Sequence, residues 1–176
     1  AAKTRAEDVG DVLFSMLKGE SGHQAREIGE LVTWLREHAK PDVVCLSNAL
    51  LIGMARQLRA ELQKPVVCLL QGEEPYLDAL PVKYREPVWL LMTERAAELD
   101  AWIAPSRWSA DRMIARLKLR PERVHVVYDG INLTGFQLRN PPPETRKETA
   151  PVLGYFARMC RDKGLDTLVE AYIAVK

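Results

Sequence analysis

Apolar residues along the chain alternate between short continuous runs and longer stretches with helical spacing. The continuous runs lie at residues 43–46, 66–70, 102–104, 124–127 and 152–156. Near-continuous apolar character over a few residues is typical of a strand covered on both faces, the usual environment in a parallel sheet. The runs therefore predict buried strands, and we expect the first four to lie parallel in one sheet.

Between these runs the apolar positions recur with a period of 3.6 residues. Six such stripes are present: Val9, Val12, Leu13 and Met16; Ile28, Leu31, Val32 and Leu35; Leu51, Ala55, Leu58 and Leu62; Val88, Leu91, Met92 and Leu99; Ala110, Met113, Ile114 and Leu117; Leu165, Leu168, Val169 and Tyr172. Each stripe indicates a helix packed on a core. Strands that alternate with helices predict an α/β protein with a Rossmann-like, doubly wound parallel sheet. Right-handed crossovers would place its helices on both faces.

One stretch, residues 136–150, shows no apolar period and contains Pro141, Pro142 and Pro143, which favour a stiff spacer. We therefore predict three parts: a partial N-terminal domain at 1–135, a Pro-rich linker at 136–150, and a first βα unit of a second domain at 151–176. One strand and one helix cannot bury their own faces, and the chain begins with a helical pattern instead of a strand. These features predict a fragment of a longer protein.

Composition narrows the classes of function. The chain has 47% hydrophobic and 28% charged residues with a net charge of +1, which favours a globular protein and argues against a nucleic-acid partner. No apolar run has the length of a membrane span. Cys45, Cys68 and Cys160 are widely spaced and odd in number, so we predict reduced structural thiols and a cytoplasmic location. The histidines show no metal-ligand spacing, and no metal site is predicted.

Two polar segments follow predicted strands in the first part. Ser106 lies between a strand and a helix and is a candidate N-cap at the edge where parallel sheets bind ligands. Gln71, Gly72 and Glu73 directly follow another strand, open the longest loop of this part, and could face a substrate. Simple helix capping and a solvated loop remain the alternative interpretations.

A third polar segment follows the last predicted strand. Arg158 and Lys163 flank one short strand-to-helix loop, and a planar guanidinium with an ammonium group suits a diphosphate. Arg161 lies between them and is expected to face solvent. The alternative is that all these cations belong to the solvated surface.

The order of these motifs resembles the glycosyltransferase group 1 enzymes of family four over nearly the whole chain. The motifs that carry the resemblance are residues 41–44, 104–106, 110–113, 121–132 with Phe136, 154–158, 163–168 and 170–171. Members are retaining enzymes with the two-domain GT-B fold, which implies a hexosyltransferase-type activity in the intact protein. A sugar would pass from a nucleotide diphosphate sugar to a hydroxyl acceptor, either a carbohydrate or a lipid-linked molecule. The nucleotide sugar is a substrate, and no separate cofactor is implied.

The resemblance also implies roles for individual residues. Arg158 and Lys163 would hold the donor diphosphate and stabilise its departure, with Gly154 in the same donor-binding motif. The loop of Gln71 would face the cleft between the domains. In the intact protein, peripheral contact with a membrane is compatible with this family.

The sequence departs from the family pattern in several places. Many relatives carry His at Gln71, Gly at Ala157 and Asp at Asn132, and the glycine-rich loop and the Glu-x7-Glu motif are absent. A non-catalytic α/β binding or regulatory module of the same fold is therefore the alternative function. We expect the chain by itself to be inactive, and an exposed sheet suggests a homo-oligomer formed by exchange of the C-terminal βα unit.

Overall fold

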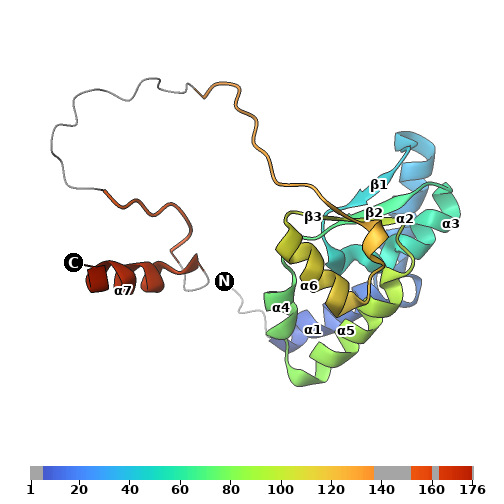
Figure 1. Cartoon of the computed structure of the whole chain (residues 1–176). Coiled ribbons are helices and arrows are strands. Elements are labelled where there is room, and N and C mark those ends of the chain that lie inside the picture. Colours follow the sequence, from blue (N-terminus) through green and yellow to red (C-terminus); the bar gives the residue numbers. More distant parts are fainter. Residues whose placement is uncertain (1–5, 137–151, 160–162, 176) are drawn as a thin grey trace. The chain divides into compact units, whose positions relative to one another are not determined.

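The computed structural model describes residues 6–136, 152–159 and 163–175, apart from the side chains of residues 6–8 (Figure 1). The chain forms two compact units, Ala1–Ile131 and Asn132–Lys176, which are described one at a time.

A single four-stranded sheet organises the first unit. Its strands are β1 (Val44–Leu46), β2 (Val66–Leu69), β3 (Ala101–Ala104) and β4 (Val124–Val126). They pair in the order β1-β2-β3-β4, and every pair is parallel. The predicted α/β class and the four parallel strands are confirmed, and each strand end lies within one residue of its expected place.

Helices connect each strand to the next, as parallel pairing requires. In chain order, the helices of the described residues are α1 (Ala6–Leu17), η1 (Gly19–Ser21), α2 (Ala25–Trp34) and η2 (Leu35–Ala39) before β1; η3 (Ala49–Met54) and α3 (Ala55–Leu62) between β1 and β2; α4 (Glu74–Asp78) and α5 (Val82–Ala96) between β2 and β3; α6 (Arg107–Leu117) and η4 (Pro121–Arg123) between β3 and β4; and α7 (Leu165–Val175). η2 is a turn of π-helix, whereas the other η elements are 3-10 helices. The six predicted apolar stripes fall on these helices, except that Leu99 lies beyond the end of α5.

The helix α4 was not predicted, because the sequence indicated a long loop after β2. Pro75 stands in the first turn of this five-residue helix. Proline is well suited to that place, since its fixed φ matches a helix and its missing N–H would have no partner there.

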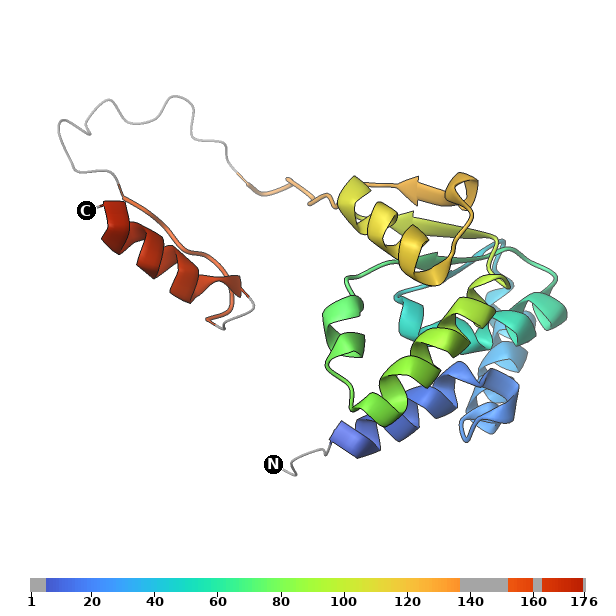
Figure 2. The same cartoon turned by 60° about the horizontal axis from the view of Figure 1, so that its bottom comes forward.

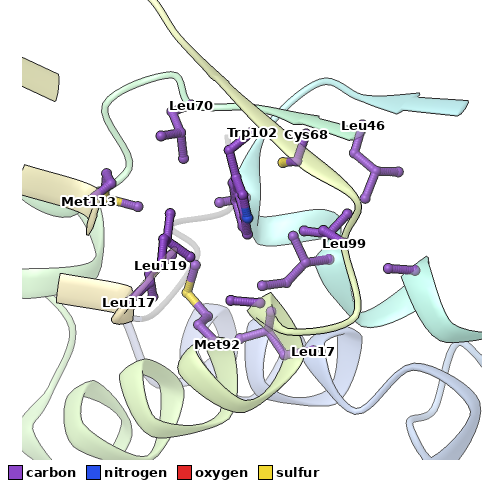
Figure 3. Packing of buried hydrophobic residues seen from close by; sticks show 14 of the residues in the cluster. Leu17, Leu46, Cys68, Leu70, Met92, Leu99, Trp102, Met113, Leu117 and Leu119 are labelled. Carbon is purple, nitrogen blue, oxygen red and sulfur yellow. The ribbon is translucent and has the colours of Figure 1, made fainter. Parts of the chain in front are cut away.

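The hydrophobic core lies between one face of the sheet and the helices. Val66, Cys68, Trp102 and Ala104 alternate along β2 and β3, point to this face and are buried. Figure 3 shows Trp102 in the middle of this packing, with side chains of α5 and α6 beneath it. The core residues labelled there are Leu17, Leu46, Cys68, Leu70, Met92, Leu99, Trp102, Met113, Leu117 and Leu119.

The opposite face of the sheet differs from the expectation of helices on both faces. Its residues are Cys45, Val67, Leu69, Ala101, Ile103 and His125, and none of them is fully buried. The strand order advances in one direction only, so right-handed crossovers place each connecting helix on the same side. Figure 2 accordingly shows the helices of the first unit gathered beneath the sheet.

The second unit contains the helix α7 and the extended segment that precedes it. Residues 152–156 were predicted as a strand, but they form none, because none of the described residues pairs with them. Val169, Tyr172 and Ile173 of α7 are exposed. None of the described residues of this unit is buried.

Candidate ligand edge of the sheet

The predicted ligand residues of the first unit gather at the carboxyl edge of the sheet. The loop of Gln71 follows β2 and Ser106 follows β3, and these two strands pair with Leu69 beside Ile103. The ladder continues past β2, because the amide of Leu70 donates to the carbonyl of Ile103 at 2.8 Å. Ligands of parallel α/β sheets bind at this edge.

Gln71 and Gly72 form the accessible part of this edge. Both are exposed, and Gly72 has a φ of +77° with no atom within 4 Å of the place where a Cβ would stand. A left-handed backbone favours glycine, which explains the residue type here. A ligand could therefore reach the side-chain amide of Gln71 and the backbone at Gly72.

Glu73 is buried, with a relative exposure of 6%. One carboxylate oxygen accepts a hydrogen bond from the amide of Ala49 at 2.8 Å. The other accepts from the amide of Gln71 at 3.0 Å. The carboxylate thus fastens the start of η3 to the loop after β2, and substrate contact by Glu73 stays a prediction.

Ser106 caps the helix α6, as the sequence predicts. Its backbone is extended, and its hydroxyl oxygen accepts from the amide of Ser109 at 3.1 Å. The cap positions the start of α6 at the same edge as Gln71. Contact between Ser106 and a substrate also stays a prediction.

Ion pairs between α4 and α6 hold the far end of the Gln71 loop. Buried Glu74 accepts from Nε of Arg112 at 2.9 Å. Asp78 accepts from the indole N–H of Trp89 at 3.0 Å and pairs with Arg116. Sequence reasoning missed these contacts, because 38 residues separate Glu74 from Arg112 and no local pattern links them.

The two described thiols have different environments. Burial, followed by the Glu73 carboxylate, raises the pKa of the Cys68 thiol, which is therefore protonated and packs as a small hydrophobe. Cys45 is also free but is exposed, since it points to the uncovered face of an edge strand. The expectation of a packed thiol holds for Cys68 and not for Cys45, and Cys160 lies outside the described residues.

The predicted donor residues belong to the second unit. Gly154, Arg158 and Lys163 are all exposed. The hydroxyl of Tyr155 donates to the carbonyl of Arg158 at 3.0 Å and lies 3.3 Å from the carbonyl of Lys163. One side chain thus brings the two ends of the loop together, a role that sequence reasoning did not assign to Tyr155.

The remainder of this loop is only partly described. Gly164 follows Lys163 with a φ of +68°, and α7 begins at the next residue. Arg161, predicted to face solvent, lies outside the described residues.

Within the described residues, no three His, Cys, Asp or Glu side chains gather in a group that could hold a metal ion. In the same ranges, no helix has the length and apolar character needed to cross a membrane.

Residues 5–134 match the family model described as Glycosyltransferase Family 4. The chain belongs to glycosyltransferase family 4. The resemblance inferred from the sequence is therefore confirmed at the level of the family. Membership implies a transferase that uses a nucleotide-sugar donor and an acceptor. Among curated proteins, none matches the chain.

The matched segment contains the whole sheet and every predicted ligand residue of its carboxyl edge. It ends at residue 134, close to the boundary after Ile131 that separates the two compact units. Arg158, Lys163 and Gly154 lie beyond the match, so their assignment rests on the sequence motif and on local geometry.

Proposed function

We propose that the intact protein is a retaining, hexosyltransferase-type enzyme of the two-domain GT-B class. It transfers a sugar from a nucleotide diphosphate sugar to a hydroxyl acceptor. The family match over residues 5–134 carries this proposal. Residues 1–135 form the acceptor-side domain, 136–150 the linker and 151–176 the first βα unit of the donor-binding domain.

The donor diphosphate is assigned to Arg158 and Lys163. Both side chains are exposed, and the Tyr155 hydroxyl contacts the backbone carbonyls of both residues, which supports their joint action on one ligand. The start of α7, just after Gly164, adds the partial positive charge of a helix N-terminus. Gly154 lies on the same segment and leaves open space where a side chain would stand.

The acceptor is assigned to the carboxyl edge of the sheet. The Gln71 side chain offers both hydrogen-bond donors and an acceptor, which suits a sugar hydroxyl. Gly72 leaves the backbone open to close approach, and Ser106 lies on the adjacent strand end. Glu73 contributes to acceptor binding indirectly, because its carboxylate fixes the backbone amide of Gln71.

The chemistry that these residues could supply is electrostatic. Cations beside the diphosphate stabilise the negative charge that develops as the leaving group departs. No separate cofactor enters this proposal, because the donor carries the activated sugar. The free thiols Cys45 and Cys68 fit a reducing, cytoplasmic location.

The test is product analysis with the intact protein and a panel of nucleotide diphosphate sugars. We expect release of nucleoside diphosphate with at least one donor, and a product whose anomeric configuration by NMR equals that of the donor. Binding of a donor without any release would favour the non-catalytic module instead. A product of inverted configuration would contradict the retaining mechanism.

A further inference from the structure

A groove with a basic rim lies at the amino ends of β3 and β4. Its volume is about 310 Å³, at the lower end of the roughly 300–1,000 Å³ that small-molecule sites occupy. It is formed by the end of α5, the start of β3 and the segment that runs from the end of α6 to η4. The candidate ligand edge around Gln71 is at the carboxyl ends of the strands, so this groove lies at the opposite edge of the sheet.

The charge around the groove is positive and poorly compensated. Lys118, Arg120 and Arg123 line it, whereas no Asp or Glu of the described residues does. Arg123 donates to the backbone carbonyl of Leu99 at 3.0 Å, and Lys118 is exposed and forms no ion pair with a described residue. Arg120 lies 3.8 Å from Glu122, but both side chains are more than half exposed, and such pairs contribute little.

Most arginines elsewhere in the first unit have a close carboxylate partner. Seven of them lie within 3.2 Å of a carboxylate oxygen: Arg26, Arg36, Arg56, Arg59, Arg95, Arg112 and Arg116. The groove therefore differs from the rest of this surface, because its compensating negative charge is missing from the described chain.

A buried hydrogen-bond donor in the groove also lacks an acceptor. Trp102 lines the groove and is 1% exposed, yet no described residue accepts from its indole N–H (Figure 3). The indole N–H of Trp89, in contrast, donates to Asp78 at 3.0 Å. Buried indole N–H groups usually have an acceptor, so this one favours a ligand with an acceptor oxygen.

We propose that this groove is a binding site for a small organic anion. The carboxylate or phosphate group of the ligand accepts from the indole N–H of Trp102 and is neutralised by Lys118 and Arg120. Its apolar body packs on Leu117 and Leu119, which line the same groove and are nearly fully buried. This site does not depend on the proposed transferase function, because it lies away from the residues assigned to acceptor binding.

The probes are phenyl phosphate, benzoate, inorganic phosphate and uncharged benzamide, at constant ionic strength. Binding to the ¹⁵N-labelled chain is followed by NMR through the indole N–H signals of Trp102 and Trp89. We expect both organic anions to shift the Trp102 proton downfield and to leave Trp89 unmoved, and the tighter of the two identifies the preferred charged group. Phenyl phosphate should bind at least about tenfold more tightly than inorganic phosphate, because its ring is removed from water.

Lys118→Gly removes one charge without disturbing the fold. Lys118 has a φ of +52° at the end of α6, a left-handed conformation that glycine favours, so the variant should melt at or above the native temperature. It should weaken phenyl phosphate binding about fivefold. Lys40→Gly is the matched control, because Lys40 ends η2 with a φ of +45° and does not line the groove. Its affinity should equal that of the native chain.

Each of four results would overturn the proposal. A Trp102 indole signal that neither organic anion moves would leave the cations only a role in stabilising the helix ends. Inorganic phosphate that binds as tightly as phenyl phosphate would show ordinary counterion attraction. Benzamide that binds as tightly as benzoate would show that charge is not recognised, and so would equal phenyl phosphate binding by Lys118→Gly and the native chain.

Discussion

The carboxylate of Glu73 accepts a hydrogen bond from the backbone amide of Ala49 at 2.8 Å, across 24 residues of sequence. Its other oxygen holds the amide of Gln71 at 3.0 Å. A single buried side chain therefore sets the relative position of η3 and the loop after β2. The geometry of the candidate ligand edge around Gln71 depends on this link.

Replacing Glu73 with Gln should weaken the link, because an amide presents N–H groups where the backbone already donates. At least one buried amide would lose its charged acceptor, so we expect the free energy of unfolding to fall by about 1–3 kcal/mol. Urea denaturation at neutral pH measures the change. Glu30→Gln, at a side chain that is 64% exposed, is the control and should alter stability by less than about 0.5 kcal/mol. Equal stability of Glu73→Gln and the native chain would show that the link contributes nothing.

The two thiols in the described part of the chain, Cys45 and Cys68, should differ in reactivity. Cys45 is exposed, whereas burial and the Glu73 carboxylate raise the pKa of Cys68, so that Cys68 stays protonated and covered. In the native chain, iodoacetamide should alkylate Cys45 and leave Cys68 unmodified until urea unfolds the protein. Peptide-resolved mass spectrometry distinguishes the two. Alkylation of both at the same rate in the native chain would contradict the described burial.

The raised pKa of Cys68 also predicts how stability depends on pH. Below the ordinary thiol pKa of 9.0, Cys68 is protonated in both the folded and the unfolded chain, so it does not change the free energy of unfolding as pH varies. Above that value the unfolded chain loses the proton first, so the contribution of Cys68 to stability should fall as pH rises. Cys68→Ala should reduce this alkaline loss in urea titrations.

Two glycines should respond to alanine in opposite directions. A Cβ at Gly53 would lie 2.0 Å from the carbonyl oxygen of Met16, so Gly53→Ala forces α1 and η3 apart and should destabilise the chain by about 1–3 kcal/mol. Gly29 lies inside α2, and the nearest atom to its Cβ would be 3.8 Å away. Gly29→Ala should therefore stabilise by about 0.5–1 kcal/mol through helix propensity. Thermal melts of the pair test this, and a destabilising Gly29→Ala would be the contrary result.

Association of the chain with itself is the next prediction. One face of the sheet carries partly exposed apolar residues, and no described residue of the C-terminal segment 152–175 is buried. Exchange of that unit between copies predicts a mass that rises with concentration in light scattering. Removal of residues 151–176 should abolish the rise. A strictly monomeric chain at high concentration would count against the exchange.

The sequence predicted the four strands of the sheet well, because each of them lies in a continuous apolar run. The fifth run, residues 152–156, forms no strand among the described residues, so an apolar run is not a sufficient signal by itself. The sequence did not predict which face the helices cover, since that depends on strand order, which the local pattern does not encode. Cys45 illustrates this, because it lies in an apolar run and yet points to the uncovered face.

The candidate site was predicted in part for a similar physical reason. The polar residues after β2 and β3 were found because strand ends are visible in the pattern, and the Ser106 cap was found from its local sequence. Three contacts were not predicted: the hydrogen bond from the Ala49 amide to Glu73, the ion pair between Glu74 and Arg112, and the hydrogen bonds of the Tyr155 hydroxyl. Each of these depends on side-chain geometry that a single sequence does not display.

The most direct test of the account is steady-state transfer by the intact protein with single substitutions in the donor loop. Arg158→Ala and Lys163→Ala should each lower kcat about 30- to 1,000-fold, a loss of about 2–4 kcal/mol of transition-state stabilisation. Arg161→Ala, in the same loop, and Arg26→Ala, at a side chain that is 84% exposed on α2, should cost little. Turnover unchanged by both Arg158→Ala and Lys163→Ala, or an equally damaging Arg161→Ala, would contradict the assignment of the diphosphate to Arg158 and Lys163.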